Sequence, residues 1–109
     1  MPVILQVNYT PSEKQQATPV EARVASAERI AALPGLHWKF WVSEPASGER
    51  GGIYLFADQA SAEAWAKQVS ASLAAAGGTN LSIRYLAIDE GLSAITRATL
   101  TPPVAQAAE

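Results

Sequence analysis

Residues 35–58, GLHWKFWVSEPASGERGGIYLFAD, decide the fold of this 109-residue chain. They contain two runs rich in aromatic and branched side chains, residues 36–42 and 52–57, joined by a polar connector with Pro45 and Gly48. Such runs predict a pair of antiparallel strands. Five of the eight Phe, Tyr and Trp residues lie in this segment, and they fall on both faces of the pair. Because the helices of a two-layer domain cover only one face of a sheet, the second face needs a partner or a ligand.

Composition and charge narrow the functional classes. The chain is 49% hydrophobic and 17% charged, which is typical of one globular domain. Its net charge of −2 and its eight scattered basic residues argue against nucleic-acid binding. No apolar run approaches the roughly 20 residues that cross a bilayer, and the N-terminus lacks the features of a secretion signal. We therefore expect a cytoplasmic protein without membrane contact.

Metal and thiol chemistry are not expected either. The chain has no Cys, which excludes disulfides and thiolate catalysis. It has one His and scattered carboxylates, so no cluster of metal ligands is visible. The sequence thus predicts neither a metal site nor a cofactor.

A strand and a helix are expected before the aromatic segment. Residues 3–9 alternate as a strand, and residues 10–17 read as an exposed loop. Thr18, Pro19 and Glu21 have the spacing of a capped helix start. This helix is expected to end near residue 33. Its expected apolar stripe is Val20, Val24, Ala27 and Ala31.

A helix, a strand and a short helix are expected after it. Asp58 is a suitable cap for a helix through residue 76, which Gly77 ends. Residues 81–88 predict a fourth strand, and residues 92–100 a short helix. Residues 1–100 would then form one domain, and residues 101–109 a C-terminal tail. The expected apolar stripe of the long helix is Ala62, Trp65, Val69 and Leu73.

This order of elements predicts an α+β, ferredoxin-like βαββαβ fold with a four-stranded antiparallel sheet. Right-handed crossovers place both long helices on one face. Alternation then sorts the strand residues, although a single bulge would reverse the faces of one strand. Expected on the helix side are Leu5, Val7, Trp38, Phe40, Ile53, Leu55 and Ile83. Expected on the opposite side are Ile4, Gln6, Asn8, His37, Lys39, Trp41, Tyr54, Phe56, Arg84 and Leu86.

Three stretches resemble the YdhR family of monooxygenases: residues 35–41, residues 51–58, and residues 89–95 with the sequence DEGLSAI. The Leu5-Gln6 pair also fits, and the GGIYLF run is the most specific part. The likeness extends to about residue 100, apart from residues 10–17. It implies a dimeric α/β barrel, in which two sheets face each other, the helices lie outside, and each half holds a pocket. It also implies oxygenation of an aromatic compound without flavin or metal.

Such chemistry requires a proton acceptor, donors for the resulting oxyanion and a dry cavity. On the face turned away from the helices, which would lie between the two sheets, the expected catalytic residues are Tyr54, Asn8 and Lys39. The expected substrate-binding residues are Gln6, Trp41, Phe56 and Arg84. The sequence therefore predicts a homodimeric, cofactor-independent monooxygenase that acts on a small phenol- or quinol-like molecule.

Other interpretations stay open. The chain could be a non-catalytic dimeric binding protein for a small hydrophobic metabolite, with Lys39 as a solvated strand residue and Arg84 paired to the partner chain. Removal of Met1 would leave Pro2 as a free secondary amine, the base of a tautomerase. Asn8 and Trp65 match positions used by haem-degrading barrels, but residues 66–78 contain no His to bind iron.

Overall fold

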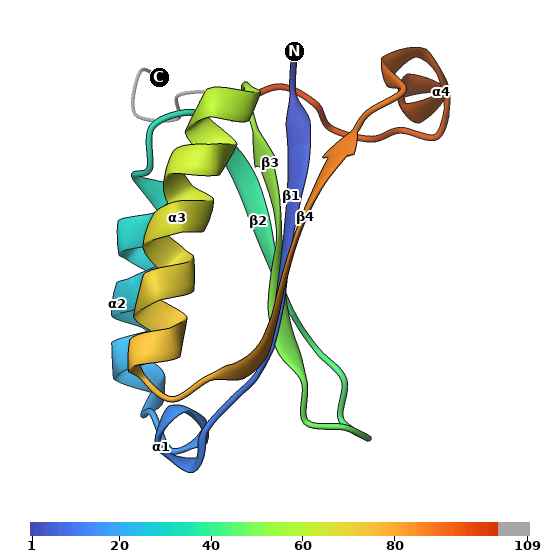
Figure 1. Cartoon of the computed structure of the whole chain (residues 1–109). Coiled ribbons are helices and arrows are strands. Elements are labelled where there is room, and N and C mark those ends of the chain that lie inside the picture. The colour runs from blue at the N-terminus through green and yellow to red at the C-terminus, as the bar shows by residue number, and fades with distance from the viewer. Residues whose placement is uncertain (103–109) are drawn as a thin grey trace.

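Four antiparallel strands form a single sheet in the order β2-β3-β1-β4, as Figure 1 shows. The computed structural model describes residues 1–102, so most of the expected tail, residues 103–109, lies outside the described residues. The predicted ferredoxin-like α+β fold is confirmed. The strands are β1 (Val3–Thr10), β2 (Leu36–Ser43), β3 (Arg50–Phe56) and β4 (Thr79–Ala87).

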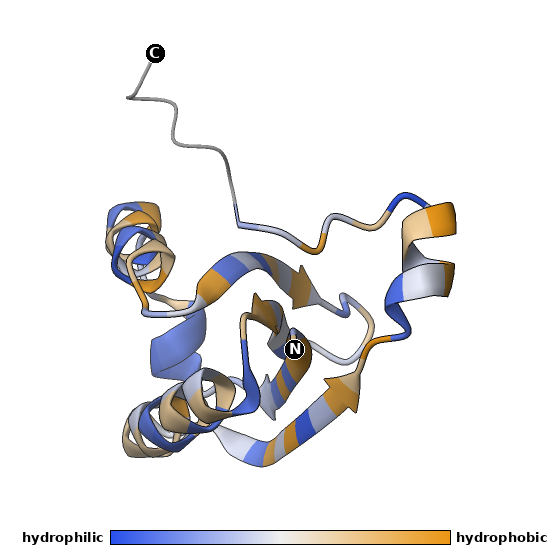
Figure 2. Cartoon of the chain, turned by 90° about the horizontal axis from the view of Figure 1, so that it is seen from above, coloured by the Kyte–Doolittle hydropathy of each residue, from blue (hydrophilic) through white to orange (hydrophobic). Residues whose placement is uncertain are grey.

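Two long helices, α2 (Val20–Ala31) and α3 (Gln59–Ala75), cover one face of this sheet (Figure 1). The backbone N–H of Ser61 donates to the Asp58 carboxylate at 2.8 Å, which confirms Asp58 as the cap of α3. The short helix α4 (Glu90–Ile95) stands on the opposite side of the sheet in both Figure 1 and Figure 2. The layer of long helices is therefore one-sided.

The segment expected to be a loop, residues 10–17, contains a short helix, α1 (Glu13–Gln16). Ser12 and Gln15 form a reciprocal capping box, with the backbone N–H of Gln15 3.1 Å from Ser12 Oγ and that of Ser12 2.8 Å from Gln15 Oε1. The predicted capping box of the next helix is wrong. Pro19 is its N-cap, without a side-chain hydrogen bond, and the Thr18 hydroxyl instead donates to a carbonyl of α1.

The core lies between β1, β3 and α3. Leu5 and Phe56 are fully buried there, and the predicted stripe of α3 is confirmed because Ala62 and Val69 are buried and Trp65 and Leu73 pack against the core. The predicted stripe of α2 is wrong. Val20 is 70% exposed and Val24 is 52% exposed. Instead Ile30 contacts the core, while Arg23 and Ser26 line the space between α2 and the sheet.

The predicted faces of β1 and β4 are correct, but those of β2 and β3 are reversed. Residues directly opposite one another in a sheet share a face. Leu5 of β1 lies opposite Tyr54, and Lys39 lies opposite Tyr54 in turn. By the same register Trp41, Tyr54 and Phe56 lie on the helix side. The residues that point away from the helices are Trp38, Phe40, Ile53 and Leu55.

The reversal has a physical cause. Both faces of β2 and β3 carry aromatic or branched side chains, so alternation within one strand cannot select the buried set. Pairing with β1 selects it instead, and the result is that Phe56 is 0% exposed whereas Phe40 is 61% exposed. A register shift between Leu36 and Trp38 leaves His37 at a bulge, half-buried and with Nδ1 lacking a hydrogen-bond partner.

The far face of the sheet, meaning the face opposite α2 and α3, is partly covered by the chain that follows α4. The Trp38 indole donates to the Thr99 carbonyl at 2.8 Å and stacks on Phe40 at 4.8 Å between ring centroids. Figure 2 shows this segment returning across the sheet from α4. Phe40 and Val42 stay exposed, as do Leu92 and Ile95 of α4. The far face therefore keeps a solvent-exposed apolar area.

Candidate functional site

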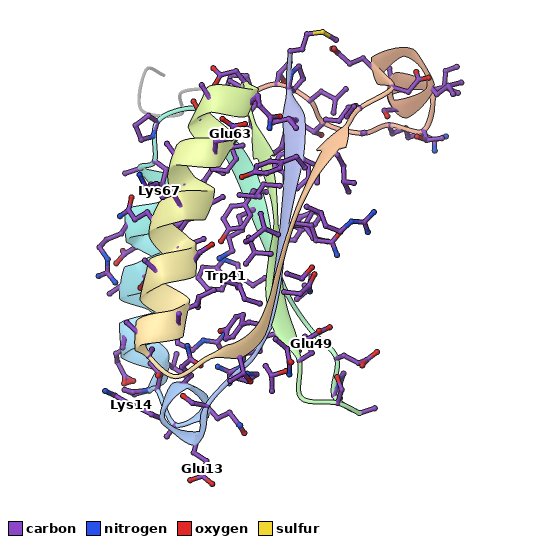
Figure 3. The ribbon with its side chains drawn as sticks, viewed as in Figure 1. Glu13, Lys14, Trp41, Glu49, Glu63 and Lys67 are labelled. Atoms are coloured by element: carbon purple, nitrogen blue, oxygen red, sulfur yellow. The ribbon has the colours of Figure 1, made fainter. Side chains whose placement is uncertain are left out.

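A cavity of about 510 Å³ lies between the two long helices and the sheet. This volume is within the usual range of small-molecule pockets, about 300 to 1,000 Å³. Its walls come from β1, α2, β2, β3 and α3, and include Arg23, Lys39, Trp41, Tyr54 and Trp65. Figure 3 shows Trp41 in the layer between helices and sheet. The cavity is thus on the helix side of one chain, whereas the sequence placed the pocket on the far face.

Lys39 is the ionisable group at the centre of the cavity wall. Its Nζ lies 3.3 Å from the centroid of the Trp41 ring and 4.7 Å from that of Tyr54. Burial, assisted by the positive charge of Arg23, lowers the pKa of Lys39 to about 7. Near neutral pH a large fraction of the Lys39 amine is therefore uncharged, and can accept a proton.

Tyr54 is a second polar residue of the cavity wall, next to Lys39, and its side chain is only 2% exposed. Burial raises the pKa of Tyr54 above its usual value of 10.0, and the nearby Trp65 indole acts weakly in the opposite direction. The two rings meet edge to face at 6.3 Å, but their polar groups do not complete a hydrogen bond, since the buried Trp65 Nε1 has no partner. Tyr54 consequently stays protonated at neutral pH and can donate a hydrogen bond.

Gly52 gives these two side chains their space. A Cβ at Gly52 would lie 2.6 Å from Lys39 Cε and 2.9 Å from Tyr54 Cε1, closer than carbon atoms can approach without movement. Gly52 lies opposite Trp41 on one side and Val7 on the other. The second glycine of the GGIYLF run therefore lets the Lys39 and Tyr54 side chains pack directly on its backbone.

The expected site residues separate into two groups. Lys39, Trp41 and Tyr54 line the cavity together. Phe56 is in the core beside them and borders a smaller, separate hollow. The other three, Gln6, Asn8 and Arg84, lie together on the far face. There the Gln6 amide donates to Asn8 Oδ1 at 3.0 Å, and Gln6 lies opposite Arg84 in the sheet.

The comparison with known families agrees with the observed fold. A family model described as "Putative mono-oxygenase ydhR" matches residues 4–99, most of the chain. The chain belongs to the YdhR family. No curated protein matches it. The YdhR family is of the dimeric α/β-barrel type, and the ferredoxin-like sheet is the half-barrel that this type requires.

Sequence patterns did not indicate Arg23, Arg29, Arg50 or Trp65 as residues of the cavity. Trp65 reads as ordinary core, yet it lines the cavity with a buried, unpartnered N–H. Arg23 lies four residues before Ala27, and Ala27 lies three residues before Ile30, so the three share one helical face. Ile30 packs on the core, so that spacing was the available signal.

Within residues 1–102, no group of three or more His, Asp or Glu side chains is arranged to hold a metal ion. Among the helices of the same residues, none is long and apolar enough to cross a membrane.

Proposed function

We propose that this YdhR-family chain is a cofactor-independent monooxygenase that acts on a small phenol- or quinol-like molecule in the cavity between helices and sheet. The observation that carries the proposal is the pairing of Lys39 and Tyr54 above the bare backbone of Gly52. Their pKa values are shifted in opposite senses, Lys39 downward and Tyr54 upward. Groups separated in this way can serve as proton acceptor and hydrogen-bond donor at one pH.

The reaction needs no electron source other than the substrate. Loss of the ring hydroxyl proton to Lys39 makes the ring electron-rich enough to react with O2. One oxygen atom forms a bond to a ring carbon, the C–H bond at that carbon breaks, and the second oxygen atom leaves as water. The O–O bond breaks, and the phenol is thereby converted to a quinone. The hydroxyl proton, passed on from Lys39, and the hydrogen of the broken C–H bond appear in the water. All the electrons that reduce O2 come from the substrate.

Three cavity residues, Lys39, Tyr54 and Trp41, act in this scheme. Lys39 accepts the proton, and its pKa of about 7 means that little driving force is lost at neutral pH. Tyr54 donates to the substrate oxyanion, and the Trp41 ring is the flat wall against which the substrate lies. Asn8, Gln6 and Arg84 take no part in this step because their side chains are on the far face.

Oxygen uptake with a panel of small quinols and polyphenols tests this function. Substitution Lys39→Met should lower kcat by about 10²- to 10⁴-fold, the range for loss of a general base. Substitution Tyr54→Phe should lower it by about 10²- to 10³-fold, as for loss of one oxyanion donor. The wild-type rate should rise with pH through about 7 as Lys39 loses its proton.

A matched control is Lys67→Met, since Lys67 is exposed on α3 and does not line the cavity. It should leave oxygen uptake unchanged. Should Lys39→Met also retain full activity, the proposed proton acceptor is wrong. A ligand that binds in the cavity without any oxygen uptake would instead favour the non-catalytic binding protein.

We also propose that two copies of the chain associate through their far faces. The family is of the dimeric barrel type, and the exposed side chains of Phe40 and Val42 lie where the second sheet would pack. The polar cluster of Gln6, Asn8 and Arg84 is on this same face. The pairing of Arg84 with a partner chain, which the sequence left open, is therefore compatible with the register of the sheet.

The oligomeric state should depend on Phe40. Substitution Phe40→Glu places a charge in the proposed interface, and sedimentation velocity at micromolar concentration should then show a monomer. Substitution Val20→Glu serves as a control, because Val20 is also an exposed apolar residue but lies on α2, away from the far face. A wild-type chain that sediments as a monomer, or a Phe40→Glu variant that stays dimeric, would refute the interface.

A further inference from the structure

The cavity has an unusual charge for this chain. Four basic side chains line it: Arg23, Arg29, Lys39 and Arg50. The whole sequence has eight Lys and Arg against ten Asp and Glu, so half of its basic residues are gathered here. In the described part of the chain, none of the lining residues is acidic, and Glu13, Glu49 and Glu63, labelled in Figure 3, are all outside the lining. The cavity is thus positive in a chain whose net charge is negative.

Within residues 1–102, no acidic side chain of the cavity wall neutralises this charge. Arg29 donates to the Ser26 hydroxyl at 3.0 Å, and Arg50 donates to the Gln15 carbonyl at 3.1 Å, both of them neutral acceptors. The charged neighbour that acts on Lys39 is Arg23, which is also positive. A guanidinium has five N–H donors, so Arg23, Arg29 and Arg50 each keep donors available for a ligand.

The walls between these cations are aromatic and flat. Trp41 and Tyr54 present ring faces to the Lys39 amine, and Trp65 adds a ring edge beside Tyr54. Gly52 has no side chain, so the Lys39 stem and the Tyr54 ring pack directly on the strand backbone. This arrangement suits a planar ring system, while the arginines of α2 suit an anion attached to that ring.

We infer that the natural ligand of this cavity is an aromatic carboxylate, whose ring packs beside Lys39 among Trp41, Tyr54 and Trp65 and whose carboxylate meets Arg23 and Arg29. The inference deepens the proposed function, on which it rests for the site, by naming the charge and class of the substrate. Carboxylates pair with guanidinium groups in a bidentate geometry, and such charge-assisted bonds are stronger than neutral ones.

A matched pair of ligands tests the charge requirement. The probes are 3-hydroxy-2-naphthoate and 2-naphthol, which share a hydroxylated two-ring system and differ by one carboxylate. Isothermal titration calorimetry at neutral pH should show that the wild-type chain binds the naphthoate about tenfold or more tightly than the naphthol. Added NaCl should weaken binding of the naphthoate and leave that of the naphthol nearly constant.

Variants locate the preference. Substitution Arg23→Gln should reduce the naphthoate preference by about fivefold or more, Arg23→Lys should retain most of it, and Lys67→Gln should not change it. Arg29→Gln is a second variant on the same helix and should also reduce the preference. Because Arg23, Arg29 and Lys67 are all exposed on helices, none of these changes should prevent folding.

The outcomes separate this inference from the oxygenase proposal. Equal affinity for the two probes, or a preference that survives both arginine substitutions, overturns the carboxylate inference and leaves the oxygenase proposal to be decided with neutral quinols. A clear naphthoate preference without oxygen uptake by any aromatic acid supports the inference and contradicts the oxygenase. Failure of both probes to bind contradicts the cavity as a ligand site, and with it both proposals.

Discussion

Substitution Lys39→Met is expected to raise the free energy of unfolding at pH 7 by about 2 to 4 kcal/mol. The folded chain holds this amine with a pKa of about 7, whereas the unfolded chain has the ordinary value of 10.5. Folding at neutral pH therefore disfavours the protonated form of Lys39, which lowers the free energy of unfolding. The expected gain is smaller than the full shift would give, because the side chain is only half-buried. Methionine keeps the length and removes the charge.

The pH dependence has a definite sign. Between about pH 7 and pH 9.5 the unfolded chain binds a proton at Lys39 that the folded chain does not, so wild-type stability should rise by up to about 1.4 kcal/mol per pH unit. Below pH 7 both states are protonated and this slope vanishes. Tyr54 and Tyr85 have raised pKa values, so they lower stability only above about pH 10. The lowered pKa of Asp58 acts only in acid.

Urea unfolding at several pH values in this window measures both effects. The Lys39→Met variant should be more stable at pH 7 and should lose most of the slope, so that the two curves converge as the pH rises. Substitution Lys67→Met is the control and should keep the wild-type slope, since Lys67 is exposed on α3. A wild-type stability that stays constant across the window would show that Lys39 titrates normally.

The second large effect separates two phenylalanines on neighbouring strands. Substitution Phe56→Ala should lower the free energy of unfolding by about 3 to 5 kcal/mol, as for a large core side chain. Phe56 is fully buried and stacks on Tyr54, with ring centroids 5.8 Å apart. Substitution Phe40→Ala removes the same atoms from a side chain that is 61% exposed within the protomer. Its cost at low protein concentration should be below about 1 kcal/mol.

Chemical denaturation at two protein concentrations distinguishes the two roles further. The loss in Phe56→Ala should not depend on concentration, because the contacts of Phe56 are within one chain. The loss in Phe40→Ala should grow with concentration if Phe40 is at the dimer interface, because mass action stabilises only the wild-type dimer. A larger loss for Phe40→Ala than for Phe56→Ala at low concentration would mean that the strand faces are those the sequence predicts.

Local patterns were sufficient for the order of elements. Helix stops at Gly35 and Gly77, the cap at Asp58 and the apolar stripe of α3 all act within a few residues, so they can be recognised in one stretch of sequence. The capping box of Ser12 and Gln15 belongs to the same class and was available to be read. The predicted cap at Thr18 is wrong because the Thr18 hydroxyl donates to a carbonyl of α1 instead of capping α2.

The residues of the site depended on longer-range information. Lys39, Trp41 and Tyr54 were recognisable as candidate site residues. On each strand a polar or ionisable side chain and an aromatic one stand two residues apart, and therefore on one face. Their separation from Asn8 and Arg84 was not recognisable, because it follows from the register between β1 and β3. Arg23 and Trp65 line the cavity because of the way α2 and α3 are oriented on the sheet.

The amino-acid order alone was enough to establish a ferredoxin-like half-barrel of the YdhR family and to indicate which side chains carry reactive groups. Those properties depend on residue type and on spacing along the chain. Folding in three dimensions settled which face of β2 and β3 meets the helices, and therefore that Lys39 and Tyr54 share one cavity. Both faces of these strands carry aromatic or branched side chains, so either face of a single strand could be the buried one. Pairing with β1 determines which face is buried.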